Sequence, residues 1–188
     1  MKKLTLLKSL LLTILLVGSV NVFGQTYLLQ EDFSSITKGD NTTTGGSSTA
    51  WNGNANFPTV NKAYQAGGAV RIGTGSATGS ITSKTLDLSV NGGNFSVSFD
   101  VKGWTTVEGN ITVTVTGLTA QTVTYTAKMA DNFENHVLNF TGGTANSTVT
   151  IATTAKRAFI DNVKVYYMSS PTLSATTLES FGEVAIGT

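Results

Sequence analysis

Two carboxylates stand at positions where the surrounding sequence pattern predicts apolar side chains. Glu31 alternates with Leu29 and Phe33, and Asp161 has the parity of Phe159, Val163 and Val165. A carboxylate on an apolar strand face needs a compensating partner, and Ca²⁺ is one such partner because it binds carboxylate and carbonyl oxygens. If the first and last strands lie side by side, Glu31 and Asp161 would form a structural calcium site. The alternative is that each carboxylate caps backbone N–H groups at the end of its strand.

Three aromatic side chains are the candidate ligand contacts. Trp51 and Tyr64 lie in or near a polar stretch, residues 34–61, that is rich in Thr, Ser, Gly and Asn, and Trp104 follows an alternating apolar run. Aromatic rings offer a large apolar face that suits the C–H face of a sugar ring, while Asn, Thr and Asp side chains hydrogen-bond its hydroxyls. These residues therefore predict contact with a carbohydrate. The alternative is that both tryptophans fill the ends of an apolar core.

Most catalytic chemistry is excluded or has no support in the sequence. The chain has no cysteine and a single histidine, His136, which excludes disulfides, thiolate nucleophiles and any site that needs two imidazoles. Residues 73–79 are glycine-rich but lack the Gly-Lys-Ser/Thr ending of a phosphate-binding loop. No Gly-x-Ser-x-Gly elbow occurs, and no spacing pairs two carboxylates as a glycoside hydrolase requires. We therefore predict that the chain is not an enzyme and has no catalytic residues.

Composition and periodicity predict that β-strands position these residues. The 188-residue chain contains 32 Thr, a residue that favours strands because its branched Cβ is restricted in a helix, and only 12% of its residues are charged. Apolar and polar residues alternate with a period of two, and no segment keeps a helical period. The clearest runs are 95–101, 111–116, 122–126 and 148–151, and weaker runs are 27–33, 69–72, 80–88, 135–140 and 157–167. The expected fold is all-β: an antiparallel jelly-roll β-sandwich of about nine or ten strands after an N-terminal signal helix.

The two ends of the chain differ from the region of the sandwich. Residues 1–24 have a basic start, a short apolar stretch and small residues before a cleavage point, which is typical of a secretory signal peptide; the alternative is a signal-anchor helix. The sandwich is expected over residues 25–168. Residues 169–188 start another alternation and are interpreted as a linker and the truncated start of a second β-domain, or else as a tail that pairs with an edge of the first. The protein is therefore expected to be secreted or at the cell surface.

The charge of the mature chain limits its partners. Without residues 1–24, nine basic residues stand against eleven acidic ones, and no run of Lys or Arg occurs. This balance argues against a nucleic-acid partner, which is bound by neutralising its phosphates. No apolar stretch in this part is long enough to span a membrane. The expected partner is a glycan or another cell-surface ligand, and the oligomeric state is left open because edge strands permit self-association.

Several segments of the chain resemble a known group of secreted modules. These are Gln-Glu-Asp-Phe at 30–33, the segments 80–88 and 95–100, and Ala-Phe-Ile-Asp-Asn-Val-Lys-Val at 158–165. They are similar to the secreted jelly-roll modules of Bacteroidetes, of the galactose-binding-like, carbohydrate-binding-module and cleaved-adhesin type. The resemblance covers about residues 27–167, and the closing Phe-Ile-Asp-Asn-Val element is its most telling part.

This resemblance implies features beyond the fold. Such modules often hold a calcium ion between the first and last strands, which falls on Glu31 and Asp161. They commonly precede further β-domains and a sorting signal for type IX secretion. Residues 173–188 are similar to the start of the Ig-like repeats that follow such modules, so the chain would be the N-terminal part of a type IX-secreted protein.

Three functions are compatible with these patterns. The preferred hypothesis is a non-catalytic module of a secreted or cell-surface protein that binds glycan or mediates adhesion through its jelly-roll loops. The alternative is a ligand-free accessory or spacer domain of a secreted nuclease, protease or glycosidase. A third, a jelly-roll lyase or hydrolase, requires two carboxylates on one concave face, where the alternation predicts Thr and Ser instead. Exposed tryptophans along a groove would favour binding, and buried ones would favour the spacer.

Overall fold

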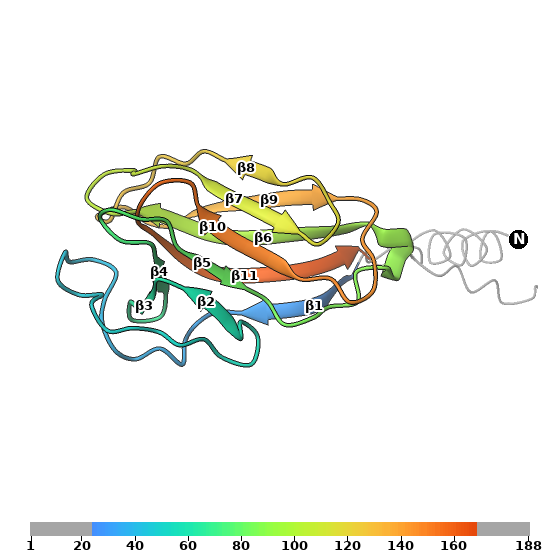
Figure 1. The fold of residues 1–188 in the computed structure, drawn as a ribbon, viewed down its shortest axis with the longest axis horizontal. Coiled ribbons are helices and arrows are strands. Elements are labelled where there is room, and N and C mark those ends of the chain that lie inside the picture. The colour runs from blue at the N-terminus through green and yellow to red at the C-terminus, as the bar shows by residue number, and fades with distance from the viewer. Residues whose placement is uncertain (1–23, 169–188) are drawn as a thin grey trace, which may run out of the picture. The chain divides into compact units, whose positions relative to one another are not determined.

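The computed structural model describes residues 24–168, of which residues 25–168 form one compact unit of two antiparallel β-sheets (Figure 1). The described residues contain one short 3₁₀ turn, η1 (Val90–Gly93), and no α-helix. The expected jelly-roll β-sandwich is confirmed. The signal helix and the second β-domain predicted for the two ends lie outside the described residues. The eleven strands are β1 (Gln25–Glu31), β2 (Thr59–Asn61), β3 (Ala63–Gln65), β4 (Val70–Ile72), β5 (Ser80–Thr82), β6 (Phe95–Gly103), β7 (Ile111–Val115), β8 (Gln121–Val123), β9 (Glu134–Phe140), β10 (Val149–Thr153) and β11 (Ala158–Met168).

Strand β11 organises the larger sheet. This six-stranded sheet has the order β3-β4-β11-β6-β9, and β1 pairs with the second half of β11 on the side where β4 pairs with its first half. The smaller, five-stranded sheet has the order β2-β5-β10-β7-β8. The first and last strands of the unit therefore lie side by side, as the calcium prediction assumed.

The period-two alternation explains how the two sheets pack together. Phe99 and Val101 of β6 point inward and pack in one apolar core with Val113 of β7 and Ile151 of β10. Full burial of such a side chain contributes about 1.5–3 kcal/mol, and alternate residues along each strand face outward. No helix among residues 24–168 is long and apolar enough to cross a membrane. The side chains that face outward are therefore free to contact other molecules.

A β-bulge in β11 changes which residues face outward. Along the β11–β6 ladder, Asp161 pairs with Asp100, but the next pair is Lys164 with Ser98, so the register shifts by one residue. Asn162 lies in the bulge with a φ of 48°, a left-handed conformation that Asn adopts more readily than most residues. Because of this extra residue, two side chains that are two positions apart in the sequence but on either side of the bulge point to opposite faces of the sheet.

Candidate ligand-binding face

The outer faces of the two sheets differ in their chemistry. The strands of the five-stranded sheet contain no charged residue, and their outward threonine hydroxyls pair with one another across the strands. The outer face of the six-stranded sheet instead carries aromatic, cationic, acidic and amide side chains. The threonine pairs are Thr82 with Thr150, Thr112 with Thr122, and Thr116 with Thr148, at oxygen–oxygen distances of 2.9, 3.1 and 3.1 Å. The larger sheet therefore carries the candidate site.

One row of residues crosses four strands of this face in register. The row, here called the aromatic–cation row, consists of Tyr64 of β3, Arg71 of β4, Phe159 of β11 and Lys102 of β6, each the cross-strand partner of the next. Directly paired side chains on one face of a sheet lie in contact range. The Arg71 guanidinium lies 4.0 Å from the centre of the Tyr64 ring. The row thus alternates rings and positive charges across the sheet.

Trp104 covers one end of this row. Its ring stacks on Phe159 at 5.6 Å between ring centres, with 19° between the planes. The guanidinium carbons of Arg157 and Arg71 lie 4.5 and 5.3 Å from its ring centre. Together with Ala66, Ala69 and Met129, Trp104 and Phe159 form a second apolar cluster, here called the outer cluster. The indole is consequently 6% exposed.

The three cations of this region, Arg157, Lys102 and Arg71, have different partners. Glu108 binds Arg157 through two hydrogen bonds, Arg157 Nε to Oε2 at 2.8 Å and NH2 to Oε1 at 2.6 Å. These bonds lower the pKa of Glu108 and raise the pKa of Arg157. Lys102 is buried, and its Nζ donates to the backbone carbonyls of Met129 and Asp131 at 3.1 and 3.5 Å. Burial lowers the pKa of this ammonium group.

Arg71 differs from these two cations because its contacts are with aromatic rings and not with hydrogen-bond acceptors. Its side chain makes no hydrogen bond or ion pair with residues 24–168, and its Nε is buried without a hydrogen-bond partner. Burial lowers the pKa of Arg71, and the nearby charge of Arg157 lowers it as well. The guanidinium is therefore positioned by two rings rather than by a carboxylate.

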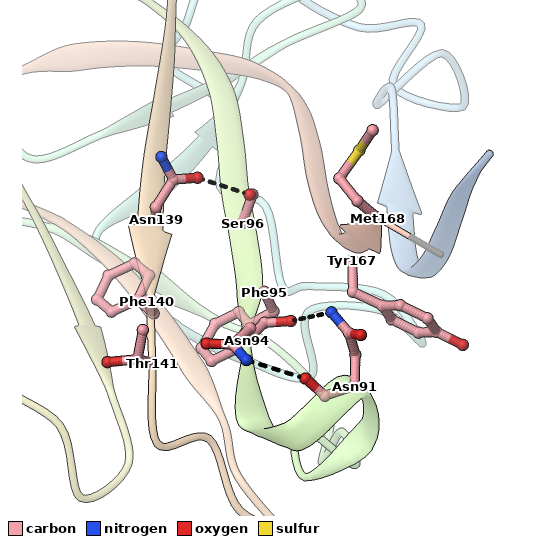
Figure 2. Close-up of a pocket in the computed structure, with 9 residues that line it drawn as sticks. All are labelled: Asn91, Asn94, Phe95, Ser96, Asn139, Phe140, Thr141, Tyr167 and Met168. Atoms are coloured by element: carbon pink, nitrogen blue, oxygen red, sulfur yellow. Dashed lines mark hydrogen bonds between the residues drawn. The ribbon is translucent and has the colours of Figure 1, made fainter. Parts of the chain in front are cut away.

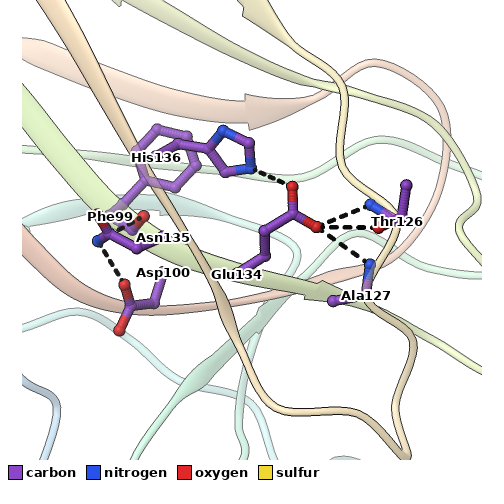
Figure 3. Close-up of polar contacts among 7 residues, drawn as sticks. All are labelled: Phe99, Asp100, Thr126, Ala127, Glu134, Asn135 and His136. Carbon is purple, nitrogen blue, oxygen red and sulfur yellow. Dashed lines mark hydrogen bonds and ion pairs between the residues drawn. The ribbon is translucent and has the colours of Figure 1, made fainter.

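A second row beside the first one is acidic and amide-rich. Asp161 of β11 pairs with Asp100 of β6, and Asp100 pairs with Asn135 of β9. Asn135 Nδ2 donates to Asp100 Oδ1 at 2.6 Å, as Figure 3 shows. Asn162 Nδ2 lies 2.8 Å from Asp100 Oδ2 and 3.4 Å from Asp161 Oδ2, so one amide group bridges both carboxylates. We call Asp161, Asp100 and Asn135 the acidic row.

The environment of Asp161 disfavours its charged form. Burial is the largest cause and raises the pKa of Asp161 to about 6, and the charges of Asp100 and Asp32 add to it. The backbone N–H of Asn162, which donates to Asp161 Oδ1 at 2.6 Å, opposes the rise. Near neutral pH this carboxylate can accept hydrogen bonds, and a hydroxyl donor would favour its ionised form.

The far end of the face carries tyrosines and an amide-lined pocket. Tyr27 of β1, which is 43% exposed, packs its ring 5.7 Å from that of Tyr166 of β11. Tyr166 pairs with Ser96, whose hydroxyl donates to Asn139 Oδ1 at 2.8 Å. An open pocket of about 260 Å³ adjoins this point (Figure 2). Its lining residues are Asn91, Asn94, Phe95, Ser96, Asn139, Phe140, Thr141, Tyr167 and Met168.

Glu134 links the edge strand β9 to the segment after β8 through hydrogen bonds (Figure 3). Glu134 Oε2 accepts hydrogen bonds from the backbone N–H of Thr126 and Ala127 at 3.0 and 3.3 Å, and its Oε1 lies 3.0 Å from His136 Nε2. The backbone bond from Thr126 is the largest of the effects that lower the pKa of Glu134. His136 itself stacks on Phe99, with ring centres 6.0 Å apart.

The structure places both predicted tryptophans in apolar clusters. Trp51 is 8% exposed and packs edge-on against Phe33 in the main core, with ring centres 5.5 Å apart. Trp104 is buried in the outer cluster. The alternative of core packing describes Trp51, whereas Trp104 packs in a separate cluster, and ligand contact by either stays a prediction. Tyr64 does lie on the candidate face, where Arg71 brings it together with Trp104.

The structure also corrects the parity assigned to Asp161. Asp161 shares the outer face with Phe159, as alternation predicts, while Ala158 and Ile160 point into the core. Because of the bulge that follows Asp161, Val163 points into the core and does not share the face of Asp161. Sequence alternation alone could not show this, since it carries no sign of the extra residue.

The surroundings of Glu31 favour a capping role. Its carboxylate accepts hydrogen bonds from Asn54 Nδ2, Asn56 Nδ2 and the backbone N–H of Phe33, at 2.8, 3.0 and 3.1 Å. A calcium ion would need oxygen ligands where these N–H donors lie. Among residues 24–168, no three Asp, Glu, His or Cys side chains are grouped as a metal site. The donor set therefore fits the capping alternative better, and calcium binding by Glu31 and Asp161 stays a prediction.

Comparison with known proteins yields distant structural similarities. No protein-family model and no curated protein matches the chain. The solved structure of BiXyn10A CBM1 in its apo form aligns with 76% of this chain and 99% of its own, with 13% identity and a TM-score of 0.47. A CBM35 from Paenibacillus barcinonensis aligns with 57% of this chain and 90% of its own, with 18% identity and a TM-score of 0.43. An exo-β-1,3-galactanase from Phanerochaete chrysosporium aligns with 79% of this chain, which spans 30% of that enzyme, with 17% identity and a TM-score of 0.43.

Proposed function

We propose that the chain is a non-catalytic glycan-binding module of an exported protein, and that it binds its ligand on the outer face of the six-stranded sheet. The observation that carries this proposal is the in-register arrangement of rings, amides and carboxylates on that face alone. A sugar ring presents apolar C–H faces together with hydroxyls that both donate and accept. The exposed Tyr27 ring can pack on the C–H face of a sugar, and the acidic row can accept hydrogen bonds from its hydroxyls.

The two carboxylates of the acidic row do not make this face a hydrolase site. A glycoside hydrolase places its carboxylates on either side of the scissile bond, inside a cleft. Asp100 and Asp161 are direct cross-strand neighbours, and the single amide of Asn162 bridges them. This geometry directs both groups to the same side of a ligand, where they accept hydrogen bonds from neighbouring hydroxyls. The proposal therefore assigns them to binding.

The test is a binding titration of residues 25–168 against a panel of neutral and acidic oligosaccharides by isothermal calorimetry. Asp100→Asn removes a charged acceptor and is expected to weaken binding about ten-fold or more, because hydrogen bonds to charged groups contribute about 1.5–3 kcal/mol. Tyr27→Ala is expected to weaken it several-fold through loss of ring contact. Thr114→Ala on the opposite sheet is the matched control and should leave the affinity unchanged.

A ligand-free spacer is the second candidate function, and the burial of both tryptophans favours it. If the folded wild-type unit binds no oligosaccharide of the panel, the glycan-binding proposal is wrong and the spacer explains the structure better. If binding occurs but only Thr114→Ala reduces it, the six-stranded sheet is the wrong face.

A further inference from the structure

Arg71 has a position that structural roles alone do not explain. Its guanidinium lies over the Tyr64 ring at 4.0 Å and near the Trp104 ring at 5.3 Å, so two aromatic side chains fix its orientation. Its Nε is buried, but its terminal nitrogens do not share that burial, and none of the three donates to a residue in 24–168. A fixed planar group with free donors is a preorganised receptor for a group with two acceptor oxygens.

Arg157, which lies against the same tryptophan ring, is an arginine whose donors are paired with a carboxylate. It also lies against the Trp104 ring, at 4.5 Å, yet Glu108 engages it through both carboxylate oxygens. Because Glu108 also accepts from the Arg157 backbone N–H at 3.2 Å, its oxygens are fully directed toward Arg157. The Trp104 ring therefore has two arginines beside it, and the carboxylate of Glu108 forms its hydrogen bonds with only one of them, Arg157.

We propose that Arg71 binds the carboxylate of a uronic acid, so that the ligand of this face is an acidic glycan. This inference rests on the proposed function and names the substrate class of the same face. The carboxylate accepts from the terminal nitrogens of Arg71, and the sugar ring that carries it lies beside Tyr64. Arginine recognises carboxylates in a bidentate geometry, which a hydroxyl cannot match.

The neighbouring acidic row gives the bound glycan a direction. Asp100 and Asp161 repel a carboxylate but accept hydrogen bonds from hydroxyls, and they lie one row away from Arg71 across Phe159. A uronic acid therefore places its anionic group on the aromatic–cation row and its hydroxyls toward the acidic row. The reverse orientation would bring three carboxylates together beside a buried site.

The experiment titrates residues 25–168 with oligosaccharides of galacturonate, glucuronate, guluronate and mannuronate, each beside its methyl ester. The esters keep the sugar skeleton and remove the charge, so this comparison needs no mutation. We expect at least one acid to bind ten-fold or more tightly than its ester. Arg71→Gln should abolish this difference, and Arg71→Lys should restore only part of it because the two-pronged geometry is lost.

Lys84→Gln is the matched control, since it removes one positive charge from an exposed side chain that bonds only Asn56 Oδ1. It should leave the preference for the acid intact, and thermal melts should show that each variant is folded. Esters that bind as tightly as the acids would overturn the inference but leave the glycan-binding proposal standing. Preference for a sulfated galactan oligosaccharide over every uronate would overturn it too. Failure of all neutral and acidic sugars would remove the proposed function itself.

Discussion

Asp161 lies among other carboxylates at a partly buried point of the six-stranded sheet. Its pKa of about 6 in the folded protein exceeds the ordinary value of 3.8, chiefly because of burial. Between these two values the folded state binds more protons than the unfolded state. The contribution of Asp161 to stability therefore falls as the pH rises from about 4 to about 6.

This shift predicts a pH-dependent effect of Asp161→Asn. The variant should gain about 1–2 kcal/mol over the wild type at pH 7, a figure reduced from the full shift because solvent screens this site, and should gain nothing near pH 4. Urea unfolding at the two pH values measures the difference. Asp87 is the control with the opposite pH dependence. Hydrogen bonds from Ser89 lower its pKa, so its contribution to the stability of the fold is lost as the pH falls. An equal gain of Asp161→Asn at both pH values would contradict the prediction.

Glu31 is the residue at which the calcium prediction can be decided. Glu31→Ala leaves three hydrogen-bond donors without their acceptor and should reduce the free energy of unfolding by about 1–3 kcal/mol, while Glu31→Gln, which keeps one oxygen, should cost less. The capping role predicts equal melting temperatures in Ca²⁺ and in chelator. A calcium-dependent rise that both Glu31→Ala and Asp161→Ala abolish would establish the metal site instead.

The bulge in β11 is the element-level feature on which the face depends. It turns Val163 into the core while Asp161 faces outward, and it places the Asn162 amide between Asp100 and Asp161. We expect Asn162→Ala to destabilise the fold by about 1–2 kcal/mol, because alanine is strained at a φ of 48° and the bridging amide is lost. Asn162→Gly removes only the amide and should cost less in thermal melts. If the two variants are equally destabilised, backbone conformation is not the reason for an asparagine here.

Most of the strands could be predicted from the sequence because they alternate with a period of two. The expected runs 95–101 and 111–116 match β6 and β7 to within two residues, whereas β2 and β3 fall in no expected run. Register is different, because which residue of β4 lies opposite Phe159 depends on the sheet order, which the alternation does not show. Arg71, alone among apolar neighbours in a three-residue strand, gives no local signal of its partners. Tyr64 could be found by residue type, but its place beside Arg71 could not.

At the scale of the whole molecule, the two tryptophans report on two apolar clusters. Trp51 lies in the core between the sheets, and Trp104 lies in the outer cluster on the far side of the six-stranded sheet. Residues 25–168 form one compact unit, so we expect both clusters to unfold in one cooperative transition. Each of the variants Trp51→Phe and Trp104→Phe keeps a single tryptophan. In each variant, the urea midpoint measured by tryptophan fluorescence should coincide with the midpoint measured by circular dichroism. An earlier midpoint for Trp104 would mean that the outer cluster opens independently.

The pairing of Gln25 with Met168 places the entry and the exit of the unit next to each other, on adjacent antiparallel strands. Both lie at the end of β11 opposite the aromatic–cation row, which pairs with the start of that strand. A tensile load applied through the two ends would therefore break the hydrogen bonds of the β1–β11 ladder one after another from that end. It would not load all of these bonds at once in shear. Under tension the β1–β11 ladder therefore opens first. The aromatic–cation row around Arg71 lies at the other end of β11, beyond this ladder.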